Sequence, residues 1–310
     1  MEKNWGIIGH QKIVDFLQKS ISARRLAHTY LFYGQSSLGK TTLAEKFAQI
    51  LLKTPEALVT ELFKIELLTD KKNISIEQIR EWRQKLVMKS FNQGYKVGII
   101  YEAEKLNIES ANALLKTIEE PTPLTIIVLI TSAWDKILPT IISRSQLIRF
   151  SLVSREEIIN KLSEINYSIN DIERIYNLVG GYPGKIINYL NNPEALAEYK
   201  KLDELVAKMI TSRVAEKFLI IEQLLAKVKE FNSKIVISLE FLKQFKILFR
   251  NLLLNNWQLT KWQQGFSQKI DKQYSLRELI NMEEALETAT EQLLSNVQPR
   301  LVLENLFINI

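Results

Sequence analysis

The sequence predicts an α/β domain built on a parallel five-stranded sheet, followed by helices that continue to the last residues. Three observations support this fold class. Five apolar runs of strand length alternate with helical patterns through the first half of the chain. A phosphate-binding loop pattern directly follows the first of these runs. After Phe150 the strand-like runs stop, and apolar residues recur at helical spacing instead.

The expected strands are short and largely apolar, as buried parallel strands are. They span Thr29–Tyr33, Leu62–Leu68, Lys96–Ile100, Thr125–Thr131 and Gln146–Phe150. Between the second and third strands, Ser75 and Gln78 form a capping-box pattern, which predicts a helix running through Trp82 and Leu86. The pattern predicts a parallel sheet flanked by helices.

The second half reads almost wholly as helix. Ser154 starts one helix, Asp171 another, and the glycine cluster at 180–184 precedes a third. From about Leu202 the helices lengthen, and large apolar residues recur at helical spacing. Examples are Phe241, Leu242, Phe245, Leu248, Phe249 and Leu252. We expect an α/β domain at residues 1–152, a small helical domain at 153–203 and a larger helical domain at 204–310.

Composition excludes several classes of protein. With 46% hydrophobic and 25% charged residues, the 310-residue chain has the make-up of a folded protein. It has no cysteine and only two histidines, so we expect no zinc site and no disulfide. No long uncharged apolar run and no signal-peptide pattern occurs, which predicts a cytoplasmic protein with no membrane partner. The net charge of +6 decides little.

The eight residues from Gly34 to Thr41 fit the P-loop pattern G-x-x-x-x-G-K-[ST]. Gly34 and Gly39 let backbone N–H groups turn toward phosphate oxygens, and Lys40 adds a positive charge. A helix beginning at about Lys40, with Thr41 and Thr42 in its first turn, presents its N-terminus to the anion. These residues predict a site for ATP or ADP, with Thr41 available as a ligand for Mg²⁺.

The acid that a P-loop ATPase needs at a neighbouring strand end is altered. The strand ending at Ile100 is followed by Tyr101, where an aspartate is expected, and then by Glu102. An uncharged phenol is a poor substitute for a carboxylate on Mg²⁺. Glu102 can still polarise a water molecule, but it lacks a correctly held metal to act with. We therefore expect nucleotide binding to be retained better than hydrolysis.

Several segments resemble one family, the clamp-loader subunits of the bacterial replicative DNA polymerase. The most specific segment, Asn112–Pro121, is similar to the stretch that follows the acidic strand in that family. Four further segments also match: Ile7–His10, Arg25–His28, Leu138–Ser145 and Asn296–Glu304. The resemblance covers nearly the whole chain. It implies an AAA+ P-loop domain, a small helical lid domain and an all-α collar domain.

The resemblance also implies partners and roles. Related subunits form a ring of five, so the expected partners are the γ/τ and δ subunits, the sliding clamp and primer–template DNA. By resemblance, Arg144 is an arginine finger that reaches the ATP site of the adjacent subunit. Ile8 lies in the loop that covers adenine in the family, and Glu102 matches part of a degenerate acidic motif.

Two departures from the family pattern favour the δ′ type of subunit over γ/τ. Tyr101 replaces the acid, and Gly184 stands about where γ/τ has an arginine in the lid. Two alternatives remain open: an active γ/τ-like ATPase, and a branch-migration helicase of the AAA+ class. In the first, Glu102 and water-mediated contacts to Mg²⁺ would suffice for hydrolysis, whereas the second would need a competent acidic site. The sequence does not assign the residues that touch DNA, although Lys116 is a candidate.

Overall fold

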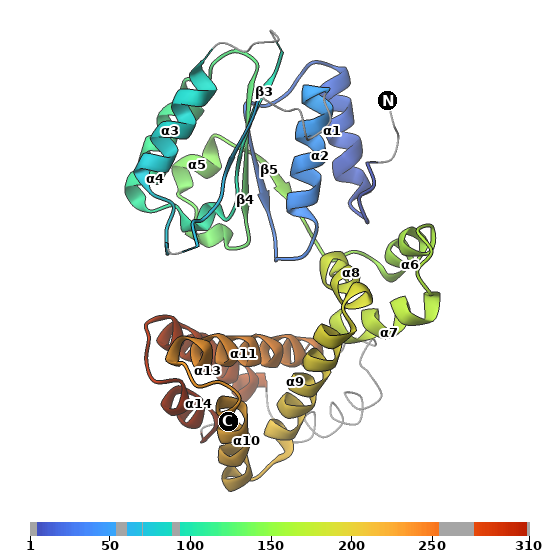
Figure 1. Cartoon of the computed structure of the whole chain (residues 1–310), viewed down its shortest axis with the longest axis vertical. Helices are drawn as coiled ribbons and strands as arrows, with labels where there is room; N and C mark the ends of the chain where they lie inside the picture. Colours follow the sequence, from blue (N-terminus) through green and yellow to red (C-terminus); the bar gives the residue numbers. More distant parts are fainter. Residues whose placement is uncertain (1–4, 54–60, 70, 89–93, 254–275, 309–310) are drawn as a thin grey trace. The chain divides into compact units, whose positions relative to one another are not determined.

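The computed structural model describes residues 5–53, 61–69, 71–88, 94–253 and 276–308. It divides into two compact units, Met1–Ile187 and Asn188–Ile310. The first unit contains the sheet and the second consists of helices, as Figure 1 shows.

The first unit is built on a parallel sheet of five strands in the order β2-β3-β4-β1-β5. The strands are β1 (Thr29–Tyr33), β2 (Leu62–Ile65), β3 (Lys96–Ile100), β4 (Thr125–Thr131) and β5 (Gln146–Arg149). All five predicted strands are confirmed. β1 lies between β4 and β5 and runs parallel to both. The loop that follows β1 is therefore at the carboxyl edge of the sheet, where ligands bind in such folds.

Two strands end earlier than the sequence suggests. Ile65 of β2 pairs with Ile100, the last residue of β3, so the chain beyond Ile65 has no neighbouring strand to pair with. In the same way, Arg149 of β5 pairs with Tyr33, where β1 ends. The apolar pattern continues past both points, but backbone pairing stops with the partner strand.

Helices cover both faces of the sheet (Figure 1). They are α1 (Gln11–Ser22), α2 (Lys40–Leu52), α3 (Ile76–Val87), α4 (Ile108–Glu119) and α5 (Pro139–Ser143), with short 3₁₀ turns η2 (Ala103–Lys105) and η3 (Trp134–Lys136). One apolar core includes Leu43 and Phe47 of α2, and the other includes Trp82 of α3 and Leu114 of α4. The two cores lie on opposite faces of the sheet, because side chains of a strand alternate between faces.

Three short helices follow the sheet: α6 (Arg155–Ser163), α7 (Ile169–Val179) and α8 (Pro183–Asn191). Capping boxes are formed at Ser75 before α3 and at Ser154 before α6. In each, the serine hydroxyl accepts from a backbone N–H while the third helical residue reaches back to the serine N–H. Because these motifs are local, the sequence alone locates the helix starts.

The second unit contains longer helices, and its described residues form an apolar core. They are α9 (Pro193–Thr211), α10 (Val214–Ala226), α11 (Phe231–Leu253), α13 (Leu276–Leu294) and α14 (Pro299–Ile308). Phe241, Leu242 and Phe245 of α11 are buried there, as their spacing predicts. The side chains of the other three residues in that pattern, Leu248, Phe249 and Leu252, lie outside the described part of the molecule.

The expected division into residues 1–152, 153–203 and 204–310 stays a prediction. The structure groups α6 and α7 with the sheet, and the core of the second unit includes Val206 and Met209 of α9. Within the described residues, no helix has both the length and the apolar character to cross a bilayer.

Candidate nucleotide site and exposed arginine

The P-loop after β1 has the backbone conformation that its sequence predicts. Gly34, Ser37 and Gly39 have φ values of 142°, 64° and 89°. A Cβ atom on Gly34 would overlap the carbonyl oxygen of Phe150, so this position requires glycine. At Gly39 the left-handed backbone alone favours glycine. Such conformations turn successive N–H groups inward to form an anion-binding concavity.

The side chain of Lys40 is hydrogen-bonded to backbone carbonyls of the P-loop. The residue is 5% exposed, and Nζ donates to the carbonyl oxygens of Gly34 and Gln35, both at 2.6 Å, and to Oγ of Ser132 at 3.3 Å. Burial lowers the pKa of Lys40 to about 8, and the negative charge of Glu104 partly opposes this shift. The ammonium is therefore mostly protonated at neutral pH and is already held where a phosphate would meet it.

Thr41 and Thr42 lie in the first turn of α2 and are exposed. Gly39 is the N-cap residue, and within the described residues no side chain caps this helix. The first N–H groups of α2 are therefore open to an anion, as in other phosphate-binding helices.

Tyr101, which stands where the acid is expected, is hydrogen-bonded to a carboxylate of α2. The hydroxyl of Tyr101 donates to Oε1 of Glu45 at 2.7 Å, and Nζ of Lys64 lies 2.9 Å from the same oxygen. Glu45 is on α2, one helical turn beyond Thr41. Glu102, expected to be the remaining acid, is exposed and has a left-handed backbone with φ of 47°.

Sequence reasoning missed Glu104. Its Oε1 accepts from the backbone N–H of Ser132 at 3.2 Å, and its charge acts on Lys40. Oε2 of Glu104 is buried and has no hydrogen-bond partner in the described structure. The sequence gives no signal for this role, because Ser132 follows β4 and meets Glu104 only through the pairing of β3 with β4.

The residues at this edge do not fit a conventional Mg²⁺ site. Thr41 offers a hydroxyl, but Tyr101 occupies the position of the expected carboxylate. In the part of the chain that the structure describes, no group of three or more His, Cys, Asp or Glu residues is placed to hold a metal. The P-loop itself fits a nucleotide phosphate without such a group.

The N-terminal loop is tied to the P-loop through His10. Its Nε2 donates to the carbonyl oxygen of Leu38 at 3.0 Å, and its ring packs edge-on against Phe150. Burial lowers the pKa of His10, against smaller raising effects of the Leu38 carbonyl and Glu157. The imidazole is thus neutral near pH 7 and serves as a hydrogen-bond donor to the loop. Ile8, two residues earlier, is half-buried, and its contact with adenine stays a prediction.

Helix α8 begins against the P-loop. The N–H of Gly184 donates to the carbonyl oxygen of Ser37 at 3.0 Å, and the Tyr182 hydroxyl is hydrogen-bonded to Oε1 of Gln35. A Cβ atom on Gly184 would lie 3.1 Å from that Ser37 oxygen, tighter than an ordinary contact. An arginine at position 184 would therefore require the loop to shift, which explains physically why glycine stands there.

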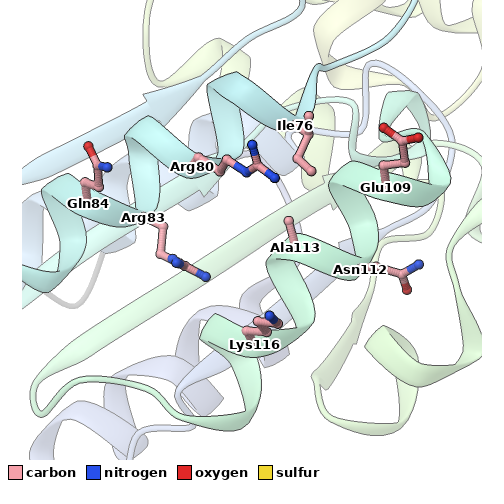
Figure 2. Close-up of a pocket in the computed structure, with 8 residues that line it drawn as sticks. All are labelled: Ile76, Arg80, Arg83, Gln84, Glu109, Asn112, Ala113 and Lys116. Atoms are coloured by element: carbon pink, nitrogen blue, oxygen red, sulfur yellow. The ribbon is translucent and has the colours of Figure 1, made fainter.

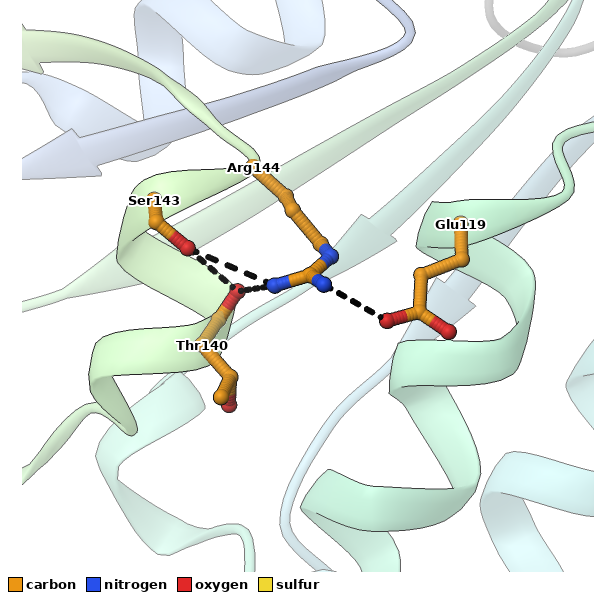
Figure 3. A network of polar contacts seen from close by, with 4 residues as sticks. All are labelled: Glu119, Thr140, Ser143 and Arg144. Carbon is orange, nitrogen blue, oxygen red and sulfur yellow. Dashed lines mark hydrogen bonds and ion pairs between the residues drawn. The ribbon is translucent and has the colours of Figure 1, made fainter.

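Arg144 lies at the amino ends of the strands, opposite the carboxyl ends where the P-loop lies. It precedes β5, and Glu119 ends α4 shortly before β4, so both are at the amino edge, whereas the P-loop is at the carboxyl edge. Figure 3 shows Nη2 of Arg144 paired with Oε1 of Glu119 at 3.0 Å, and Nη1 donating to the carbonyl oxygen of Thr140 at 3.2 Å. The Arg144 side chain is 43% exposed. It is therefore directed away from the P-loop of its own chain.

A groove of about 570 Å³ runs between α3 and α4 (Figure 2). Its lining residues are Ile76, Arg80, Arg83, Gln84, Glu109, Asn112, Ala113 and Lys116. Three cationic side chains and one carboxylate give the groove a positive balance. Lys116, the candidate that the sequence leaves unassigned, is one of the three cations.

Comparisons with known proteins find similarity to subunits of DNA polymerase III. Residues 9–154 match a family described as DNA polymerase III, delta subunit. The chain is 30% identical to DNA polymerase III subunit tau of Bacillus subtilis over 51% of its own length and 31% of that protein. It is 35% identical to subunit delta' of Pseudomonas aeruginosa over 38% of its own length and 41% of that protein. The chain thus spans less than half the length of these relatives.

A solved structure supports the fold along the chain. The crystal structure of a DNA polymerase III gamma subunit-related protein from Thermotoga maritima aligns with a TM-score of 0.56. The alignment covers 94% of this chain and 97% of that one, at 18% identity. The predicted fold class, an α/β domain on a parallel five-stranded sheet followed by helices, is confirmed.

Proposed function

We propose that this chain, which belongs to the clamp-loader family of DNA polymerase III subunits, acts as a δ′-type subunit. In this role it assembles with γ/τ and δ subunits into an ATP-driven complex that places the sliding clamp on primed DNA. The observation that carries the proposal is the position of Arg144: exposed, and at the edge of the sheet opposite its own P-loop. Such an arginine is suited to act on a neighbouring subunit.

In this proposal one set of residues binds nucleotide within the chain, and Arg144 acts on a neighbouring subunit. Lys40, the N–H groups of the P-loop and the start of α2 bind the phosphates of ATP or ADP. Arg144 extends its guanidinium toward the γ-phosphate of the adjacent γ/τ site, where the charge that develops during transfer is stabilised. ATP supplies the phosphoryl group at that neighbouring site.

Assembly with γ/τ and δ is the direct test of the proposal. Native mass spectrometry of the full chain mixed with purified γ/τ and δ is expected to show one copy of this chain in each complex. Exposed apolar side chains on α10, α11 and α14, such as Leu219, Val236 and Leu301, support contacts of the second unit with other subunits.

A chain ending at Asn192, before α9, serves as the control and is expected to stay outside the complex. If the full chain forms no complex, or forms rings of itself alone, the proposal is wrong.

The alternative is an active γ/τ-like ATPase. It is favoured by the intact P-loop and by Glu104, a carboxylate next to Lys40. Against it stand Tyr101 and Gly184, each of which occupies a position that the γ/τ pattern gives to a catalytic group.

The groove between α3 and α4 is the surface that we assign to DNA phosphates. Replacing Arg80, Arg83 and Lys116 together with glutamine is expected to weaken binding of primed DNA by the assembled complex. The dependence of log K on log salt should become shallower by up to about 0.9 for each lost phosphate contact. Fluorescence anisotropy over a range of salt concentrations measures both effects (Figure 2).

A matched control replaces three exposed cations in and just after α1, Lys12, Lys19 and Arg24, with glutamine. This triple variant removes the same charge elsewhere on the unit and should keep the wild-type salt slope. Equal slopes for the groove variant and the wild type would contradict the assignment.

A further inference from the structure

The geometry around Tyr101 points to a nucleotide site that binds ATP or ADP without a divalent metal. This inference rests on the proposed nucleotide binding and specifies its chemistry. It concerns the carboxyl edge of the sheet, where β3 ends beside the P-loop helix.

Tyr101 stands at the position where a metal-binding acid is expected, and its hydroxyl is already hydrogen-bonded to Glu45. It directly follows β3, and its hydroxyl reaches Oε1 of Glu45 at 2.7 Å. Glu45 lies four residues beyond Thr41, so both side chains are on one face of α2. The phenol ring therefore bridges the strand end and the helix on the side where Thr41 would present its hydroxyl to a cation.

The carboxylate of Glu45 already has a cation. Nζ of Lys64 lies 2.9 Å from the oxygen that accepts from Tyr101. Mg²⁺ demands a nearly ideal octahedral shell of oxygen ligands and gives up its water reluctantly. A carboxylate oxygen that is shared between an ammonium and a phenol is a poor member of that shell.

Glu104 and Glu102, the two other acids near the P-loop, do not supply the missing Mg²⁺ ligand. Glu104 uses Oε1 to accept from the N–H of Ser132. Its Oε2 has no partner in the described structure, but the carboxylate already acts on the charge of Lys40, so a metal there would compete with the ammonium. Glu102 is exposed and follows a different backbone direction, with φ of 47°.

Positive charge for the phosphates is available without metal. Lys40 is held inside the loop, and the uncapped start of α2 adds its partial positive charge. Because Lys64 also brings a cation to this edge, added Mg²⁺ meets repulsion where it would otherwise gain from a carboxylate. Metal-free ATP carries two more negative charges than its Mg²⁺ complex, which favours it at such a site.

Isothermal titration of the full chain with ATP tests the inference, in excess Mg²⁺ and in excess EDTA. The two dissociation constants are expected to agree within about twofold. Tyr101→Asp restores the expected acid and should make binding at least about tenfold tighter with Mg²⁺ than with EDTA. Tyr101→Phe keeps the ring but loses the hydroxyl and should stay indifferent to the metal, which separates the effect of the new carboxylate from loss of the Glu45 contact.

If Mg²⁺ tightens ATP binding by the wild type about tenfold or more, the inference is overturned. Absence of ATP binding in both buffers overturns it together with the nucleotide part of the proposed function. The proposed δ′ role would survive that second result, since it is measured separately by assembly with γ/τ and δ. Should Tyr101→Asp fail to fold, the wild-type comparison still decides.

Discussion

Replacing Arg144 with alanine is expected to slow ATP hydrolysis at the neighbouring γ/τ site by roughly 10³–10⁵-fold, the usual value of an arginine finger. The other sites of the complex keep their arginines, so total ATPase should fall partially. Clamp loading should fall further, because the complex needs its sites to act together. The chain itself should stay folded, because Arg144 and Glu119 form an exposed pair, 43% and 45% accessible, worth about 0–1 kcal/mol.

The measurement is steady-state ATPase and clamp loading by reconstituted complexes with primed DNA and clamp present. Glu119→Gln is the matched control: it removes the ion pair of Figure 3 but leaves the guanidinium, so activity should be largely retained. Arg144→Lys should rescue poorly, because a single ammonium does not reproduce the forked contact. Complexes with Arg144→Ala that match the wild type in both assays would rule out the trans role.

The sequence predicts this fold well wherever the signal is local. Five apolar runs give the five strands, and the serines before α3 and α6 locate both helix starts through their capping boxes. Strand ends are less predictable, because β2 and β5 stop where their partners stop rather than where their own apolar pattern stops. Pairing partners lie far apart in the chain, so no local pattern records the end.

The candidate site is predicted only in part for the same reason. The P-loop is a local motif, and its left-handed residues and inward Lys40 follow from it. The contacts of Glu104 with Ser132, and of Gly184 with Ser37, join segments that the fold brings together. Tyr101 is conspicuous in the sequence as a missing acid, but its hydrogen bond to Glu45 requires the packing of β3 against α2.

The isolated chain is expected to turn over ATP at least about 10³-fold more slowly than the assembled complex. Three losses combine. The hydroxyl of Tyr101 is hydrogen-bonded to Glu45, and Tyr101 offers no carboxylate for a metal. Gly184 packs against Ser37 and brings no lid cation to the γ-phosphate. No neighbouring subunit contributes an arginine when the chain is alone, and its own Arg144 is at the far edge of the sheet.

A phosphate-release assay on the isolated chain, with Mg²⁺ and saturating ATP, measures this turnover. Lys40→Ala is the matched control for contaminating ATPase, because it removes the cation of the P-loop while leaving Arg144 in place. The wild type and Lys40→Ala should give nearly the same low rate. If the wild type instead hydrolyses ATP as fast as a purified γ/τ subunit, and Lys40→Ala abolishes that rate, Glu104 and the P-loop suffice for catalysis. The chain would then be a γ/τ-like motor, since a subunit that serves chiefly to supply Arg144 has no need of a competent site of its own.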